Sequence, residues 1–151
     1  MTELGVIVVA GGSGKRMGAP GGKNLLPLAG STVVGRALDG VAQAPGASRW
    51  ILVGRANEVE ALTQAFGDVW EVIEGGVFRL DSVERGLEVL DGATELVLIH
   101  DGARPCPDDD AVARCVAAAT ETGAAVVGTR PTDTIKSLDG DLVAETLDRR
   151  S

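Results

Sequence analysis

Aromatic residues are scarce in this chain, which has no tyrosine, two phenylalanines and two tryptophans among 151 residues. The composition nevertheless argues against disorder, because 44% of the residues are hydrophobic and only 24% are charged. The core must therefore be built from aliphatic side chains. A domain of this length buries roughly 68–70% of its unfolded surface, so we expect one compact core.

Positive charge is also in short supply, with 14 lysines and arginines against 22 acidic residues and a net charge of -8 at pH 7. Nucleic acids and anionic membranes bind basic surfaces, so the charge argues against both as partners. Long hydrophobic runs are missing too. The N-terminal run Val6–Ala10 is too short for a signal segment or a membrane span. We expect a cytoplasmic protein in which any anionic ligand is bound by local groups.

Cysteine and histidine offer little chemistry, since the chain has two cysteines and one histidine. Cys106 and Cys115 lack CxxC spacing, and we interpret them as structural thiols in a reducing compartment. His100 ends an apolar run and is interpreted as a packed residue rather than a catalytic one. The chemistry of the chain must therefore be sought elsewhere, in its glycine-rich loops.

Short runs rich in valine and isoleucine recur along the chain and predict buried strands. They are Gly5–Ala10, Arg49–Gly54, Val69–Glu74, Glu95–His100 and Ala124–Thr129. Segments of helical periodicity separate them, as at Val34, Leu38 and Val41. A parallel crossover needs a connection of helix length, so this alternation predicts a mainly parallel sheet covered on both faces. The expected fold class is α/β, a Rossmann-like three-layer sandwich.

Ligands of such sheets bind beyond the carboxyl ends of the strands, where the loops at 11–23, 75–82 and 101–107 lie. The first loop lies in the stretch AGGSGKRMG. It is not a P-loop, because Arg16 stands where serine or threonine is required. It also misses the GxGxxG fingerprint, whose third glycine would be Met17. A wide glycine loop beside an arginine favours a nucleotide triphosphate, with a plain flexible turn as the alternative.

Cationic side chains accompany the first two loops. Lys23 follows two glycines, and together with Arg16 it would neutralise charge on a phosphoryl group during transfer. A solvated surface lysine is the alternative. In the second loop, Gly76 and Arg79 precede Ser82 at a helix start, where backbone amides can bind a base edge or a phosphate. An ordinary capped helix would explain the serine alone.

The third loop begins with HDGARP, in which a buried strand ends in opposite charges three positions apart. Asp101 is a candidate ligand for a magnesium ion or for substrate hydroxyls, and Arg104 is a candidate phosphate-binding residue. A simple salt bridge between the two would also account for this pair.

The C-terminal stretch departs from the alternation of strands and helices. Two β-like runs, Thr134–Leu138 and Leu142–Leu147, flank Asp139–Asp141, which is a hairpin signal. A two-stranded ribbon is marginal by itself, so we expect a protruding arm that packs on a partner subunit. The chain accordingly divides into a nucleotide-binding α/β domain at 1–133 and a dimerisation arm at 134–151.

Six motifs in fixed order, AGGSGKRMG, GGK, GGVFRLDSV, HDGARP, DTIK and TLDR, give the chain a resemblance to a known family. Over nearly its whole length it resembles the 2-C-methyl-D-erythritol 4-phosphate cytidylyltransferases of the non-mevalonate isoprenoid pathway. The resemblance implies a nucleotidyltransferase-type fold and a homodimer. It also implies a reaction that joins CMP from CTP to an alditol phosphate, with Mg²⁺ as cofactor and pyrophosphate as product.

The resemblance assigns roles to individual residues. Nucleotide contacts are implied for Ala10, Gly11, Gly12, Gly14, Gly76, Arg79 and Ser82. The resemblance implies that Arg16 and Lys23 are the catalytic pair, which would stabilise the α-phosphorus during in-line attack. Contacts to methylerythritol phosphate are implied for Asp101, Gly102, Arg104 and Thr134, with Arg149 reaching the substrate from the neighbouring subunit. The implied mechanism is catalysis by positioning and charge neutralisation, which would need no protein nucleophile.

The chain also departs from the family pattern. Gly11 and Gly102 replace usual alanines, Gly22 replaces a proline, and Asn24-Leu25 stands where glutamine and an aromatic residue are common. Family members continue beyond this length, so we expect that the chain lacks a C-terminal third. Two alternatives stay open. One is a CDP-ribitol-forming or other sugar-phosphate nucleotidyltransferase of the same fold, and the other is a non-catalytic nucleotide-binding module.

Overall fold

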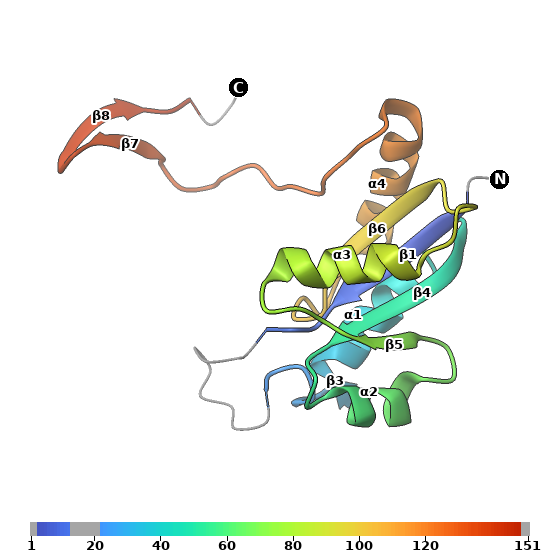
Figure 1. Cartoon of the computed structure of the whole chain (residues 1–151). Helices are drawn as coiled ribbons and strands as arrows, with labels where there is room; N and C mark the ends of the chain where they lie inside the picture. The colour runs from blue at the N-terminus through green and yellow to red at the C-terminus, as the bar shows by residue number, and fades with distance from the viewer. Residues whose placement is uncertain (1–2, 13–21, 149–151) are drawn as a thin grey trace.

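A computed structural model of the chain describes residues 3–12 and 22–148, and its largest feature is a four-stranded parallel sheet (Figure 1). The strands, in spatial order, are β5 (Glu71–Glu74), β4 (Ala47–Gly54), β1 (Leu4–Val9) and β6 (Leu96–Asp101). The helices are α1 (Val33–Ala42), α2 (Val59–Phe66), α3 (Arg79–Val89) and α4 (Asp109–Thr122). Two antiparallel pairs join β2 (Pro27–Leu28) to β3 (Ser31–Thr32) and β7 (Lys136–Asp139) to β8 (Leu142–Thr146).

The predicted α/β class is confirmed, and its centre is β1. Ile7 of this strand stands opposite Ile51 of β4 on one side and Ile99 of β6 on the other, both in parallel register. Every residue of β1 is buried. A strand that is covered on both faces has no polar side, which explains why the sequence LGVIVV is a continuous apolar run rather than an alternating one.

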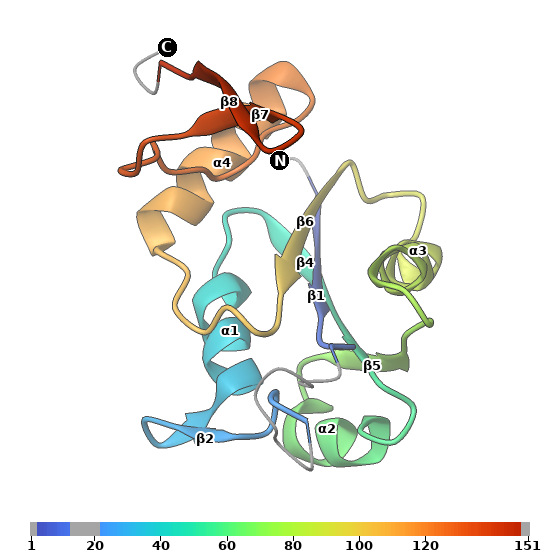
Figure 2. The same ribbon diagram turned by 90° about the vertical axis from the view of Figure 1, so that its left-hand side faces the viewer.

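Side chains of β1 point alternately into two core layers. On one face Val6 and Val8 pack in a cluster with Val34 and Leu38 of α1. On the other face Ile7 belongs to a second cluster, which also includes Ile51, Val53 and Val83, the last from α3. Figure 2 shows α1 and α3 on opposite sides of the sheet. The molecule therefore has the three predicted layers, and its core is aliphatic as the composition requires.

The predicted strand Ala124–Thr129 is wrong. Residues 123–135 follow α4 without regular structure, and β6 is the edge of the four-stranded sheet (Figure 1). Val126 and Val127 are 91% and 57% exposed. The run has the β-branched composition of a strand, but a strand exists only where another strand pairs with it. After Gly123, which has a φ of 86°, this run pairs with no strand among the described residues.

The predicted C-terminal hairpin is confirmed. β7 and β8 pair with Asp139 opposite Leu142, and Gly140 adopts a φ of 60° in the turn. In Figure 1 the hairpin lies well away from the sheet, at the end of a long irregular segment. The division into domains at residue 133 stays a prediction. Within the described ranges, none of the helices combines the length and the apolar character needed to cross a membrane.

Candidate active site

A cleft of about 560 Å³ opens at the carboxyl edge of the parallel sheet, where several loops meet. Backbone hydrogen bonds hold these loops together. The amide of Ala10 donates to Val53 (2.8 Å), and the amide of Gly102 donates to Val9 (2.9 Å). The predicted site residues that line this cleft are Ala10, Gly11, Gly12, Lys23, Gly76, Arg79, Ser82, Asp101 and Arg104. The topology therefore brings together the loops that were singled out from the sequence.

Two glycines that follow β1 and Ala10 line the cleft without side chains. A Cβ atom at Gly11 would lie 3.5 Å from Oγ of Ser82, and one at Gly12 would lie 3.4 Å from Cε of Lys23. The glycine loop thus runs between the start of α3 and the lysine. Small residues here leave space in which a ligand can approach the backbone closely.

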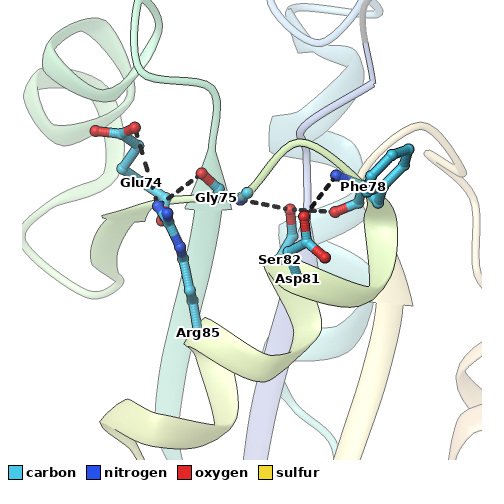
Figure 3. Close-up of polar contacts among 7 residues, drawn as sticks. Glu74, Gly75, Phe78, Asp81, Ser82 and Arg85 are labelled. Atoms are coloured by element: carbon cyan, nitrogen blue, oxygen red, sulfur yellow. Dashed lines mark hydrogen bonds and ion pairs between the residues drawn. The ribbon is translucent and has the colours of Figure 1, made fainter.

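The loop before α3 is held by a network of hydrogen bonds (Figure 3). Oγ of Ser82 accepts from the amide of Gly76 (3.2 Å) and donates to the carbonyl of Phe78 (3.3 Å). The carboxylate of Asp81 accepts from the amide of Phe78 (2.9 Å). A Cβ at Gly76 would lie 2.2 Å from that of Asp81, so a larger residue does not fit. Ser82 therefore organises the loop as well as lining the cleft.

Arg85, about one turn further along α3, also forms hydrogen bonds to this loop. Its NH1 group donates to the carbonyls of Glu74 (3.1 Å) and Gly75 (2.8 Å), as Figure 3 shows. The carbonyl of Gly75 is thus satisfied by a side chain rather than by a neighbouring strand. Three residues of α3, Asp81, Ser82 and Arg85, thus hold the path between β5 and the helix.

Asp101 joins two arginines across the cleft. Its Oδ1 accepts from Nε (3.0 Å) of Arg79, whose NH2 lies 2.9 Å away, and its Oδ2 accepts from Nε of Arg104 (3.0 Å). Burial raises the pKa of Asp101, but the hydrogen bonds and charges of Arg79 and then Arg104 outweigh it, so the pKa lies below the ordinary 3.8. The carboxylate is therefore ionised at neutral pH.

The described residues that line the cleft include this one carboxylate and three cations, Lys23, Arg79 and Arg104. The cleft is therefore locally positive in a chain whose net charge is -8. That contrast fits the expectation that an anionic ligand is bound by local groups. His100 takes no part in lining it. Its Nε2 lies 3.0 Å from the carbonyl of Arg104, which fits a structural role in the turn.

The lowered pKa of Asp101 predicts a specific loss of stability in acid. A group whose pKa is lower in the folded state stabilises the fold above its unfolded pKa, and this stabilisation is lost as the pH falls through the folded value. We expect the wild type to lose more unfolding free energy than Asp101→Asn between about pH 5 and pH 2, measured by urea unfolding. Asp68→Asn, at an exposed turn between α2 and β5, serves as control. Equal losses in the wild type and Asp101→Asn would contradict the prediction.

Asp101 in this arrangement does not fit a resident magnesium ion. Both of its oxygens accept from guanidinium groups, and the described ranges contain no group of three or more histidine, cysteine and acidic side chains that could hold a metal. Magnesium in nucleotide enzymes is usually bound through one or two carboxylates and substrate phosphates. The geometry thus gives no support to the expectation that this carboxylate is a metal ligand.

Two other predicted site residues that the structure describes do not line the cleft. Gly102 is buried behind it, where a Cβ atom would lie 3.2 Å from that of Ala10. Thr134 is exposed in the irregular segment before β7. Three further predicted residues, Gly14, Arg16 and Arg149, lie outside the described residues. Sequence reasoning assigned no site role to Asn24, which lines the cleft beside Lys23.

Comparison with known proteins decides the family. The family model described as "IspD: 2-C-methyl-D-erythritol 4-phosphate cytidylyltransferase" matches residues 4–151. The chain belongs to this family. A curated relative named 2-C-methyl-D-erythritol 4-phosphate cytidylyltransferase, from Prochlorococcus marinus (strain MIT 9313), is 45% identical over 152 residues. The match covers 95% of this chain and 66% of that relative. The resemblance drawn from the six motifs is confirmed.

Solved structures of the family share the fold. The 4-diphosphocytidyl-2C-methyl-D-erythritol synthase of Anaerococcus prevotii DSM 20548 superposes with a TM-score of 0.86 at 27% identity, covering 99% of this chain and 66% of that one. The 2-C-methyl-D-erythritol 4-phosphate cytidylyltransferase of Thermus thermophilus gives a TM-score of 0.74 at 28% identity, covering 98% and 64%. The chain thus spans about two thirds of the length of these relatives.

Proposed function

We propose that the chain carries the nucleotide-binding and catalytic part of a cytidylyltransferase, which joins CMP from CTP to 2-C-methyl-D-erythritol 4-phosphate. Family membership supports this activity. The observation that carries it is the meeting, in one cleft, of the glycine loop, Lys23 and the arginine-bound Asp101. A site of this kind offers a triphosphate both close backbone approach and positive charge.

The proposed chemistry is an in-line displacement at phosphorus. A phosphate oxygen of the alditol phosphate forms a bond to the α-phosphorus of CTP, and the bond from that phosphorus to the β-phosphate oxygen breaks, releasing pyrophosphate. Catalysis then consists of holding both substrates in line and stabilising the charge on the transferring group. Lys23 faces the glycine loop and is the described cation assigned to this charge. Arg16, its proposed catalytic partner, lies outside the described residues.

In this proposal Arg79 contacts CTP and Arg104 contacts the alditol phosphate. Arg79 begins α3 beside the glycines of the proposed nucleotide loop, and Arg104 follows the end of β6, where the alditol phosphate is placed. Both guanidinium groups pair with the same carboxylate, at 2.9 Å for Arg79 and 3.0 Å for Arg104. Magnesium enters the proposal as the counter-ion of the CTP triphosphate, because phosphate oxygens are ligands it commonly uses.

Pyrophosphate release tests the proposed function. Release is expected with CTP and 2-C-methyl-D-erythritol 4-phosphate together, and not with either one alone. Faster release with ribitol 5-phosphate would assign the chain to the CDP-ribitol-forming alternative. Absence of release with every alditol phosphate, in a chain that still binds CTP, would favour a nucleotide-binding module.

Nucleotide selectivity provides a test that does not depend on turnover. We expect CTP with magnesium to raise the melting temperature more than ATP or GTP with magnesium at the same concentration, because only cytosine should match the base pocket near Gly76 and Ser82. Differential scanning fluorimetry measures the three shifts. Equal shifts from all three nucleotides would contradict the assignment of cytidine.

We also propose a homodimer formed through the β7–β8 arm. Apolar side chains of the arm and its flanks are exposed in the single chain, namely Ile135, Leu138, Leu142, Val143 and Leu147. A two-stranded ribbon needs further packing for stability, and a second arm related by a two-fold axis would supply it. A cytoplasmic location is proposed as well. The free thiols of Cys106 and Cys115 support it, since disulfides are rare in reducing compartments.

A further inference from the structure

Lys23 is partly accessible, although the residues on either side of it are buried. Gly22 is buried, and Asn24 is 1% exposed, whereas Lys23 itself is partly accessible and lines the cleft. Within residues 22–26, which we call the lysine segment, the amide of Leu26 donates to the carbonyl of Lys23 over a long 3.4 Å. The position of the lysine segment must therefore be determined by contacts with other parts of the chain.

Asn24 makes those contacts with two elements. Its Nδ2 donates to the carbonyl of Ala10, at the end of β1 where the glycine loop begins. Its backbone carbonyl accepts from the amide of Val34 (2.9 Å) in the first turn of α1. The residue next to the lysine thus ties the segment to the glycine loop and to a helix start. Both bonds have large separations along the chain, so they fix tertiary position rather than local shape.

Glu58 supports the same segment from the residue before α2. Its side chain is 3% exposed, and Oε2 lies 3.4 Å from Nδ2 of Asn24. Oε1 lies 3.9 Å from NH1 of Arg55. The carboxylate does not cap the helix, because the residue makes no side-chain cap hydrogen bond. A buried polar group is unfavourable unless it is hydrogen-bonded, so the presence of this side chain beside Asn24 requires a reason other than helix formation.

Gly22 shows how closely the carboxylate and the lysine segment fit. A Cβ at this position would lie 2.2 Å from Oε1 of Glu58, and the residue has a φ of 82°. Both the space and the backbone conformation therefore require glycine. This explains why glycine stands directly before Lys23. The segment passes over the buried carboxylate at van der Waals contact.

We propose that Glu58, acting through Asn24, is a positioning residue that holds Lys23 against the glycine loop for phosphoryl transfer. The inference rests on the proposed function, and it assigns a role to a carboxylate that touches no substrate. A lysine side chain is flexible, so its charge is useful in a transition state only if its backbone is fixed. A displacement of about 1 Å in a catalytic group can lower a rate by about 100-fold.

The kinetic test compares Glu58→Ala with Glu58→Gln. Alanine removes the contact to Asn24, so we expect kcat to fall at least about tenfold while KM for CTP changes less than about threefold. Glutamine keeps an acceptor and the same size, and should restore kcat to within about threefold of the wild type. Glu60→Ala, which removes an exposed carboxylate in the first turn of α2, is the matched control and should leave kcat unchanged.

Hydrogen exchange provides a second readout, which reports on the position of the segment around Lys23 and does not depend on turnover. Hydrogen exchange of the amides of Val34 and Leu26 should accelerate in Glu58→Ala, while the amide of Leu52 in the central sheet exchanges at the wild-type rate. Unchanged exchange at both amides, or acceleration spread equally to Leu52, would overturn the proposal. So would wild-type kcat in Glu58→Ala alongside accelerated local exchange. A wild type that releases no pyrophosphate would instead overturn the proposed function, and exchange would still decide whether Glu58 positions the segment.

Discussion

Replacement of Lys23 by alanine should lower kcat for CMP transfer by about 10²–10³-fold while weakening CTP binding much less. The lysine lies beside Gly12 at the end of β1, where the proposed triphosphate binds. The charge distribution on the transferring phosphoryl group differs between bound CTP and the transition state. An ammonium ion placed against it therefore contributes more to the transition state than to the ground state.

Steady-state kinetics and CTP titration together check this prediction. Lys23→Arg retains the charge but replaces a compact ammonium with a larger planar fork, so an intermediate kcat is expected. Arg114→Ala is the control, because it removes an exposed cation from α4, outside the cleft. A variant Lys23→Ala that loses CTP affinity but keeps its kcat would show that the lysine is a ground-state contact.

The central sheet could be predicted from the sequence because burial on both faces leaves a local signature. The runs at Gly5–Ala10 and Arg49–Gly54 are continuous and apolar, and they correspond to β1 and β4. The same signature failed at Ala124–Thr129. Composition reports the tendency of a segment to pair as a strand, whereas actual pairing depends on a neighbour at the open edge of β6.

The candidate site was predictable to the extent that it depends on loops at strand ends. Lys23, Arg79 and Asp101 were found because parallel topology brings these ends to one edge. Of the two arginines that pair with Asp101, the sequence could predict only the nearby one, Arg104. The pair Asp101 and Arg104 is three positions apart, whereas the contact between Arg79 and Asp101 spans 22 positions and leaves no pattern in the sequence.

Glu58 shows the same limit more clearly. It precedes a helix and resembles an exposed acidic residue of a first turn, yet its side chain is almost fully buried. Its contact with Asn24 spans 34 positions. Only the folded arrangement reveals that this carboxylate contacts the segment that carries Lys23. Positioning residues of this kind are detected through packing rather than through motifs.

The arm carries the second large expected effect, which concerns catalysis across a subunit interface. The hairpin exposes apolar side chains, including Leu142 and Val143, that a second copy of the arm would cover. Arg149 follows β8 in the sequence and lies outside the described residues. If the arm reaches a partner subunit, this arginine is available to bind the alditol phosphate in the partner's cleft, with the bidentate geometry that guanidinium favours.

A mixture of two inactive variants tests this directly. Arg149→Ala and Lys23→Ala are each expected to be nearly inactive alone, but in a mixed dimer one cleft combines an intact lysine with an intact arginine from the partner. Equal mixing with free exchange should restore about a quarter of the wild-type activity, because half of the dimers are mixed and each has one complete site. Mixing Arg149→Ala with the double variant Lys23→Ala/Arg149→Ala is the control, since no complete site can form. If subunit exchange is demonstrated and activity does not return, Arg149 does not act across the interface.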